Sequence, residues 1–297
     1  MSLNQKNEAS TTQAPVVVFY HQECSDGFGA ALSAWLKYAD KTPITLTPLS
    51  YGDTLPALPT ASNVYILDFS LPVDVFLELR KNNFRVSMID HHQTAQEHYG
   101  QFFAGDRDII FDMNHSGAAL AWLHFHPGTK VPALIRYIED KDLWTWKLPG
   151  SLEINSALAS HPMDFALWNR FLLELENSPP EETALYKEGS AILRYQERLL
   201  GQAIKNTGTM GRLDQGEEGF FVNSPILNSE IGGRAKTFSN MVGIWSVKPD
   251  GRVSYSLRSS DGGPDVARIA QRFGGGGHKR AAGFIVDQIV HTPLPPK

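Results

Sequence analysis

Short apolar segments rich in β-branched residues alternate with helical patterns through the first 126 residues, and this alternation restricts the fold more than any other feature. Strands are predicted in "APVVVFYH" (14–21), "NVYILDFS" (63–70) and "FRVSMIDHH" (84–92). Helices are predicted in "GFGAALSAWLKYAD" (27–40), "PVDVFLELRKNN" (72–83) and "SGAALAWLHFH" (116–126). Continuous apolar strands separated by amphipathic helices are typical of βαβ units. The sequence therefore predicts an α/β fold whose parallel sheet is covered on both faces.

The length of 297 residues exceeds what one hydrophobic core commonly supports, so we expect two domains. Helical patterns dominate from about residue 130 to 205, and β-like segments with a further helix follow. We predict a polar, disordered lead-in at 1–14, a first domain at 15–180, a helical connector at 181–207 and a smaller C-terminal α/β domain at 208–297. A cleft between the two domains is the expected place for a substrate.

Charge and cysteine content narrow the function classes. The net charge of −5 disfavours a surface for long nucleic acid, although a local basic pocket for a short ligand remains compatible with it. Cys24 is the single cysteine, which favours a reducing compartment, and we expect the cytoplasm. The sequence offers neither a leader pattern nor about 18 consecutive apolar residues, so we expect no membrane association.

Acids and histidines follow the predicted strands at the points where these end. His21 and Asp26 follow the first strand, and Asp68 follows the second. The third ends in Asp90, His91 and His92; alone, this tripeptide is also compatible with a solvated turn. The carboxyl ends of parallel strands share one edge of a sheet, where ligands gather. Carboxylates and imidazoles suit Mn, Zn, Co or Fe, so the pattern favours a metal site.

A glycine cluster near the C-terminus, "GGGGHKRAAGF" (274–284), is either a flexible loop or a binding loop. Successive glycines such as Gly275, Gly276 and Gly277 let backbone N–H groups approach an anion or a sugar closely. His278 adds a donor beside them. Arg258, in the alternating segment "VSYSLRS", is either an exposed strand residue or a planar fork for a phosphate or a base.

These segments together resemble the DHH phosphoesterase superfamily, in particular members with a DHH-associated C-terminal domain such as nanoRNases and phosphoadenosine-phosphate phosphatases. "HQECSDGFGAA", "ILDFS", "IDHH" and "IEDKDLW" are similar to the four N-terminal motifs, in the order of the family. "SYSLRSS" and "GGGGHKRAAGF" are similar to those of the C-terminal domain. The resemblance spans nearly the whole chain after the lead-in.

The resemblance implies a set of metal ligands. His21 would bind a first ion, and Asp26 and His91 would bind a second. Asp68 would bridge the two ions, and Asp140 would complete the ligand set of the second ion. Asp142 is the alternative ligand at this position, but the spacing to Trp144 favours Asp140.

The resemblance also implies roles around these ligands. Asp90 would orient His91, and His92 would face the phosphate and stabilise the charge that develops in the transition state. Ser116, predicted as a helix N-cap, would support the phosphate pocket. The substrate-binding residues would be Arg258, Gly275, Gly276, Gly277 and His278. For His115 and the other isolated histidines the sequence predicts surface or structural roles.

The first motif departs from the family's pattern, because Cys24 stands where relatives place an aspartate. A thiolate binds Zn or Fe well and Mg or Mn poorly. Four interpretations are open. Cys24 is itself a metal ligand, Glu23 takes its place from a shifted loop, or the first metal site is weak or empty. In the fourth, Cys24 is a small buried side chain without a role in metal binding. These alternatives bear on the number and identity of the ions.

The function implied is that of a metal-dependent phosphodiesterase or phosphatase in which metal-activated hydroxide attacks a phosphate ester. We expect one or two divalent ions, with Mn first and Zn, Co or Fe as alternatives, and a short oligonucleotide or nucleotide phosphate as substrate. The alternatives are a small-phosphate phosphatase or pyrophosphatase, and a non-catalytic nucleotide-binding protein with a degenerate first metal site. A homodimer is compatible with the sequence, which fixes neither the substrate nor the cleavage polarity.

Overall fold

The structure is a computed structural model that describes residues 14–83 and 85–295. The predicted disordered lead-in lies outside these residues, apart from Ala14. The chain divides into two compact units. The first consists of the chain up to His91, Phe103–Lys147 and Pro162–Asn177, and the second of His92–Phe102, Leu148–His161 and Ser178–Lys297.

The first unit contains a parallel sheet of five strands in the order β2-β1-β3-β4-β5. The strands are β1 (Val16–His21), β2 (Ile44–Leu49), β3 (Asn63–Leu67), β4 (Arg85–Asp90) and β5 (Ile109–Phe111). The apolar residues of the central strands are buried on both faces, as the uninterrupted run of Val16, Val17, Val18 and Phe19 in β1 predicts.

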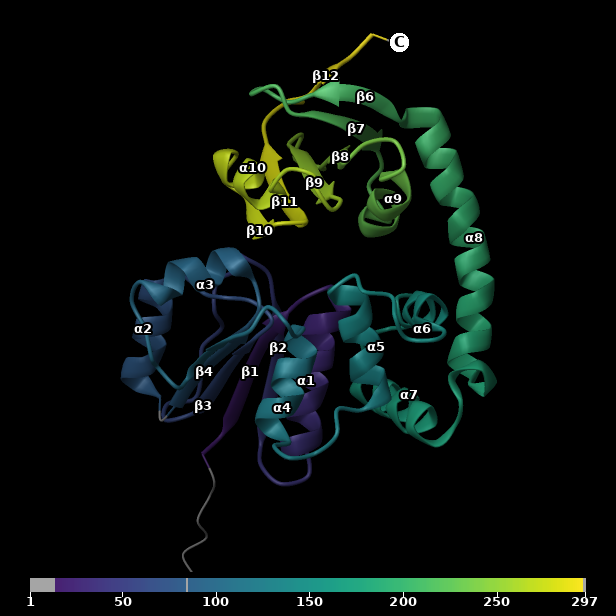
Figure 1. The fold of residues 1–297 in the computed structure, drawn as a ribbon. Coiled ribbons are helices and arrows are strands. Elements are labelled where there is room, and N and C mark those ends of the chain that lie inside the picture. The colour runs from purple at the N-terminus through teal and green to yellow at the C-terminus, as the bar shows by residue number, and fades with distance from the viewer. Residues whose placement is uncertain (1–13, 84, 296–297) are drawn as a thin grey trace, which may run out of the picture. The chain divides into compact units, whose positions relative to one another are not determined.

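Helices cover both faces of this sheet (Figure 1). Helices α1 (Ser25–Tyr38) and α4 (Gly117–Phe125) pack on each other and on one face, and α2 (Val73–Asn82) lies on the other. Helices α5 (Ala133–Asp142) and α7 (Phe165–Asn177) complete the unit. The predicted α/β fold with a covered parallel sheet is therefore confirmed.

The strand order places a ligand site at one edge of the sheet. β2 lies on one side of β1. From β2 the chain crosses to the other side of β1, where it forms β3 and then β4. In open parallel sheets, ligands bind at the carboxyl ends of the strands next to this reversal. The ends of β1 and β3, at His21 and Leu67, flank it.

The second unit contains a mixed sheet in the order β10-β11-β9-β8-β7-β6-β12. Its strands are β6 (Thr209–Arg212), β7 (Glu218–Asn223), β8 (Met241–Val247), β9 (Val253–Ser259), β10 (Gly276–His278), β11 (Ala281–Val286) and β12 (Thr292–Pro293). Only β7 and β8 pair in parallel among the described strands of this sheet, and α9 (Asn228–Ala235) connects them. The segment "KPDGR" (248–252) forms the turn that joins β8 to β9, with Gly251 at φ +87°.

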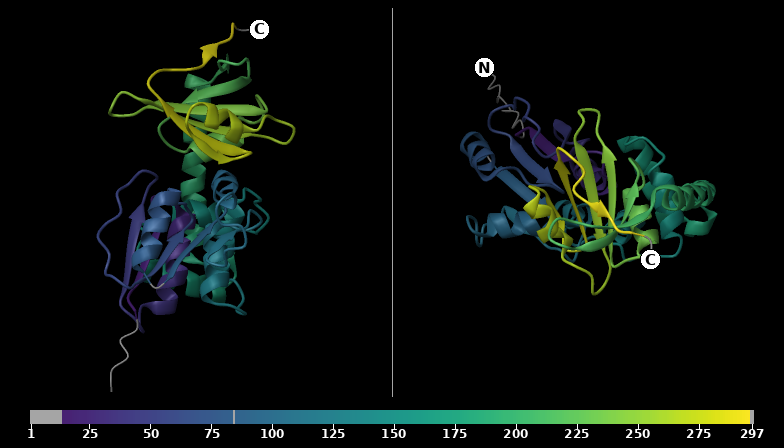
Figure 2. Two further views of the ribbon diagram at one scale, coloured as in Figure 1. Left: turned by 90° about the vertical axis from the view of Figure 1, so that its left-hand side faces the viewer. Right: turned by 90° about the horizontal axis from the view of Figure 1, so that it is seen from above.

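Two cores cover opposite faces of the mixed sheet. Phe221, Tyr255 and Leu257 pack with α10 (Val266–Arg272). Phe220, Val222 and neighbouring residues pack instead with α9 and the end of α8 (Ala184–Thr207). Adjacent residues of β7 thus pack into different cores, because successive side chains of a strand point to opposite faces of the sheet. Figure 2 gives two further views of the same ribbon.

The remaining helices of the second unit are α3 (Gln93–Gly100), α6 (Ser151–Leu158) and the short η1 (Pro180–Glu182). Helix α6 packs closely on α8, where a Cβ added to Gly189 would lie 1.8 Å from the carbonyl oxygen of Glu153. Among the described helices, none combines the length and the apolar character that crossing a bilayer requires.

Candidate metal centre and substrate-binding residues

The residues predicted as metal ligands lie at the carboxyl edge of the parallel sheet. His21 is the last residue of β1, Asp68 follows β3 directly, and His91 follows β4. Asp68 and His91 are 1% and 2% exposed. Side chains that follow three neighbouring strands therefore meet at this edge, as predicted from the strand ends, with Asp68 and His91 buried and His21 partly exposed.

Asp68 lies between two histidines. Its Oδ1 is 3.2 Å from Nε2 of His91, and its Oδ2 is 3.6 Å from Nδ1 of His21. The backbone of Asp68 is left-handed (φ 63°), a conformation in which Asp is among the tolerated residues and which is common at functional sites. Gly117 leaves room for this carboxylate, because a Cβ there would lie 2.6 Å from Oδ1 of Asp68.

Asp26, in the first turn of α1, is held by the N-terminus of α4. Its Oδ2 accepts the backbone N–H of Gly117 (2.6 Å) and its Oδ1 that of Ala118 (3.0 Å). The first N–H groups of a helix lack partners within the helix and favour an anion. The same Oδ2 is 3.5 Å from Nε2 of His91, so the carboxylate is fixed where a metal ligand is expected.

Two groups of metal-ligating atoms lie entirely within the first unit. One comprises Asp26, His91 and Asp142, the other His21, Cys24 and Asp68, and the atoms of each group lie within 4.8 Å of one another. Carboxylate oxygen and imidazole nitrogen suit Mn, Fe, Co and Zn, while the sulfur of the second group suits Zn and Fe best. These residues fit two divalent ions, with Asp68 offering one oxygen toward each group.

Burial and the charges of neighbouring acids shift the pKa values of the side chains in this cluster. Burial raises the pKa of Asp26 well above its usual range, and the charges of Asp68 and Asp142 raise it further. Burial lowers the pKa of His91, but its hydrogen bond to Asp68 and the charges of Asp142 and Asp26 outweigh this and raise the pKa to about 10. A cation is thus favoured among these carboxylates.

Asp140 and Asp142 have different surroundings, although both lie at the end of α5. Oδ2 of Asp142 is 3.5 Å from Nε2 of His91, and its side chain is 28% exposed. The carboxylate of Asp140 accepts hydrogen bonds from the hydroxyl of Thr145 and, at 2.8 Å, from the backbone N–H of Lys147. The structure thus brings Asp142 to the cluster, whereas the sequence favoured Asp140, whose described bonds hold the following loop.

Asp90 supports the strand end. Its Oδ1 accepts the backbone N–H of His91 (2.7 Å), and its Oδ2 accepts the hydroxyl of Ser70 (2.6 Å). The side chain is fully buried. Asp90 therefore fixes the backbone from which His91 extends and ties the end of β4 to the segment after β3.

Cys24 occupies the N-cap position of α1 and belongs to the group with His21 and Asp68. Burial of the thiol raises its pKa well above the usual range, and the charges of Asp68 and Asp26 add to this shift. The preceding Glu23 has a left-handed backbone (φ 53°). Of the two residues considered for the missing aspartate, the structure brings the cysteine to the candidate ligands.

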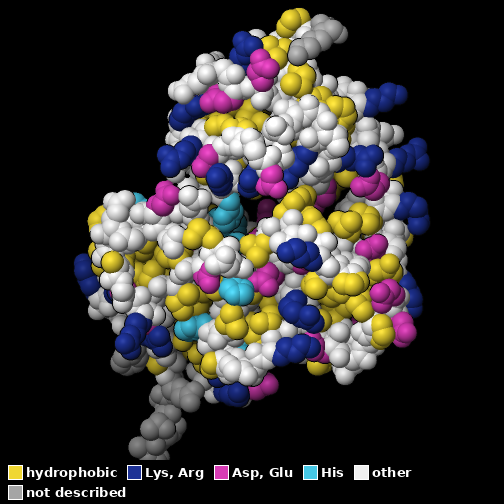
Figure 3. Space-filling model, viewed as in Figure 1, with side chains coloured by type: hydrophobic (Ala, Val, Ile, Leu, Met, Phe, Trp, Pro, Cys, Tyr) yellow, Lys and Arg dark blue, Asp and Glu magenta, His cyan; other side chains and the backbone are white. Residues whose placement is uncertain are grey.

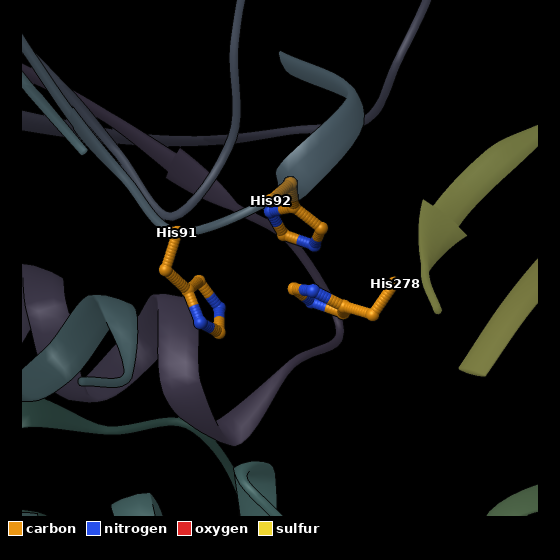
Figure 4. A group of neighbouring side chains, drawn as sticks. All are labelled: His91, His92 and His278. Atoms are coloured by element: carbon orange, nitrogen blue, oxygen red, sulfur yellow. The ribbon is translucent and has the colours of Figure 1, made fainter. Parts of the chain in front are cut away.

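His92 begins α3, at its N-cap position, and belongs to the second unit. Its ring stacks on that of His278 of β10, with centroids 4.7 Å apart and planes inclined by 21°. Figure 4 shows His91 and His92 leaving the end of β4 in succession, with the His92 ring against that of His278. The structure thus joins a residue of the "DHH" tripeptide to one of the glycine cluster.

The glycine cluster forms the tight hairpin of β10 and β11 rather than an open loop. A Cβ on Gly275 would lie 2.0 Å from the carbonyl oxygen of Gly283, and one on Gly277 2.6 Å from that of Ala281. A Cβ on Gly276 would contact only Thr94, at 3.4 Å or more. Close backbone packing therefore explains Gly275 and Gly277 without a ligand.

Arg258 on β9 is held in one orientation. Its guanidinium donates to the Ser256 hydroxyl (2.9 Å), the Leu257 carbonyl (2.9 Å) and the Ser229 hydroxyl (2.8 Å). Burial lowers the pKa of Arg258. Lys236, at the end of α9, carries a pKa lowered by burial and then by the charges of Arg258 and Arg280. The sequence analysis did not single out Lys236, because it lies in no motif.

Ser116 caps α4, as predicted, and is fully buried. Its hydroxyl accepts the backbone N–H of Ala119 (3.3 Å), and its own N–H donates to Oε1 of Glu139 (3.3 Å). That carboxylate also lies 2.8 Å from Nδ1 of His115. The turn that holds Asp26 is therefore tied to α5.

Comparisons with known proteins agree with this architecture. The DHHA1 domain family matches residues 224–292. The uncharacterized protein R106 of Acanthamoeba polyphaga mimivirus is 31% identical over 310 aligned residues, which cover 96% of this chain and 70% of that protein. The chain belongs to the DHH phosphoesterase superfamily.

A solved structure shows the same fold. The DHH domain of a member of the s1p family of ribosomal proteins aligns with a TM-score of 0.58 at 13% identity, and the alignment covers 92% of this chain and 82% of that one. The DHHA1 match contains Arg258, Gly275 to Gly277 and His278, so the residues predicted to bind substrate all fall in this domain except Ser116. The resemblance stated from the sequence motifs is thereby confirmed.

Proposed function

We propose that this chain hydrolyses phosphate esters of short oligonucleotides or nucleotides with the help of two divalent ions. Mn is the first choice for the group of Asp26, His91 and Asp142, and Zn or Fe suits the group that contains the sulfur of Cys24. The observation that carries the proposal is the position of Asp68, whose two carboxylate oxygens face His91 and His21 respectively. A carboxylate placed between two ligand groups is what a two-metal site for phosphoryl transfer needs.

Asp26, His91 and Asp142 would hold one ion, and His21 and Cys24 the other, with Asp68 shared. When bound, such ions would supply a hydroxide nucleophile near neutral pH and would neutralise the charge of the phosphoryl oxygens. Asp26 stays in place through the N–H groups of α4, and Asp90 through the backbone of His91. His92 would donate a hydrogen bond to a phosphoryl oxygen of the bound ester.

Arg258 and His278 would bind the part of the substrate beyond the scissile phosphate. The guanidinium of Arg258 is oriented before a ligand arrives, which favours a fixed phosphate or base. The face shown in Figure 3 carries Lys and Arg side chains interspersed with Asp and Glu, a pattern that supports a short substrate over a long polyanion.

The test is a substrate panel with Mn, Co, Zn and Mg in turn, after removal of metal by a chelator. We expect dinucleotides or nucleoside bisphosphates to be hydrolysed with Mn, and pyrophosphate to be a poor substrate. The protein from which the chelator has removed metal should regain activity when Mn is added back. Hydrolysis of pyrophosphate alone would replace the proposal with a small-phosphate phosphatase, and no hydrolysis with any of the ions would contradict it.

A further inference from the structure

The pair formed by His115 and Glu139 lies at the start of α4, and neither residue belongs to the candidate metal groups. Nδ1 of His115 is 2.8 Å from Oε1 of Glu139. The His115 side chain is 42% exposed, and that of Glu139 22%. Because Nδ1 faces the carboxylate, Nε2 lies on the opposite side of the ring. An imidazole oriented in this way by a carboxylate is a common arrangement for proton transfer.

The position of His115 is tied to the metal cluster through a short, rigid stretch of chain. His115 is two residues before Gly117, and two residues span at most about 7 Å. The N–H of Gly117 binds Asp26, and its Cα faces the carboxylate of Asp68. Ser116, between them, is fully buried and donates its N–H to Glu139. The pair and the metal ligands Asp26 and Asp68 therefore contact the same turn at the start of α4.

Hydrolysis of a nucleotide ester leaves an oxygen that must gain a proton, because an alkoxide is a poor leaving group in water. We propose that His115, held by Glu139, supplies this proton; the inference rests on the proposed function. The oxygen of the water-derived nucleophile bonds to phosphorus, the bond from phosphorus to the leaving oxygen breaks, and the proton passes from Nε2 to that oxygen. The neutral imidazole then regains a proton from solvent. Glu139 is the positioning residue.

Two esters with different leaving groups test this role. A dinucleotide releases a sugar hydroxyl, which needs a proton, whereas bis(p-nitrophenyl) phosphate releases a phenolate that is stable near neutral pH. We expect His115→Ala to lower kcat/KM for the dinucleotide by about 100-fold or more. The same variant should change kcat/KM for the nitrophenyl ester by no more than about threefold. A structural role would lower both alike.

The chain offers a matched control. Nε2 of His161 lies 2.8 Å from Oε2 of Glu188, so His161→Ala breaks a histidine–glutamate pair of the same length in the second unit. We expect this variant to keep both activities. Glu139→Gln retains an oxygen for the N–H of Ser116 but removes the charge, and it should weaken dinucleotide hydrolysis selectively. Mn binding, measured by calorimetry, should be unchanged in all three variants.

Equal losses for both esters in His115→Ala, or unchanged turnover of the dinucleotide, would overturn the assignment. Loss of Mn binding in that variant would also overturn it, since His115 would then support the metal site. A wild type that hydrolyses neither these esters nor a nucleoside bisphosphate would contradict the proposed function itself, and the inference would fall with it.

Discussion

Asp140 and Asp142 are separated by one residue and differ in what they contact. Residues two positions apart on a helix point to different faces, so the end of α5 can direct one carboxylate to His91 and the other to the loop that follows. In that loop Trp144 and Trp146 have left-handed backbones (φ 56° and 51°). The bonds from Thr145 and Lys147 to Asp140 hold this conformation.

Substitution by asparagine should separate the two roles. We expect Asp142→Asn to lower the affinity for Mn by at least about 100-fold, because an oxygen ligand loses its charge. The free energy of unfolding without metal should change little, because the charge of Asp142 disfavours ionised Asp26 but favours protonated His91. Asp140→Asn should instead lower the free energy of unfolding by about 1 kcal/mol.

Calorimetric titration with Mn and urea unfolding of both variants check these expectations. The converse result, in which Asp140→Asn loses Mn and Asp142→Asn binds it, would restore the ligand that the spacing to Trp144 favoured. Sequence spacing alone could not decide which of the two acids is the metal ligand, because both fit the motif. The geometry at the end of α5 determines which carboxylate faces His91.

At the scale of elements, the strands with uninterrupted apolar residues were predictable and the irregular ones were not. β1, β3 and β4 follow the predicted segments closely. β2 was missed because "ITLTPL" is half-exposed and contains Pro48, as an edge strand allows. α9 was missed because Gly232 and Gly233 lower its helix propensity; Gly232 makes room for Arg258, whose Cγ would lie 2.4 Å from an added Cβ.

Two glycines of α8 give a prediction at this scale. Gly189→Ala should lower the free energy of unfolding by about 1–3 kcal/mol, because its Cβ would collide with the Glu153 carbonyl of α6. Gly201 in the same helix has no atom within 4 Å of an added Cβ. Gly201→Ala should therefore raise the free energy of unfolding, by about 0.5–1 kcal/mol.

Urea unfolding of the two alanine variants measures the difference. Equal effects would mean that α6 and α8 do not approach each other as closely as the structure has them, since the intrinsic helix propensity changes identically at both positions.

At the scale of the molecule, the fold class could be predicted from the alternation of strands and helices. The superfamily could be predicted from motifs that occur along the chain in the order of the family. The packing of the second unit could not, because it depends on contacts between distant segments. His291 is an example: its ring stacks on Phe221, and its Nδ1 is 2.6 Å from the hydroxyl of Tyr255. The sequence shows only an isolated histidine near the C-terminus.

This buried imidazole predicts an acid-sensitive stability. Burial lowers the pKa of His291 below its usual value of 6.5. The unfolded chain therefore binds the proton more readily, and stability that is complete above about pH 6.5 is lost as the pH falls toward the lower pKa of the folded state. The loss is at most about 1.4 kcal/mol per pH unit below 6.5.

Urea unfolding at pH 7.5 and 5.5 tests this. His291→Phe should lose less stability than the wild type between the two values. Some loss should remain, because burial also lowers the pKa of His124 and of His126. The same pH dependence in both proteins would show that His291 binds its proton equally well in the folded and unfolded chains.

The left-handed backbone at Asp68 also guides the choice of an inactive protein for capturing a substrate complex. Alanine would remove the carboxylate but would strain the backbone at φ 63°, and so disturb the site to be studied. Asparagine adopts this conformation readily and has the shape of aspartate without its charge. Co-crystals intended to reveal the bound nucleotide should therefore be grown with asparagine at this position.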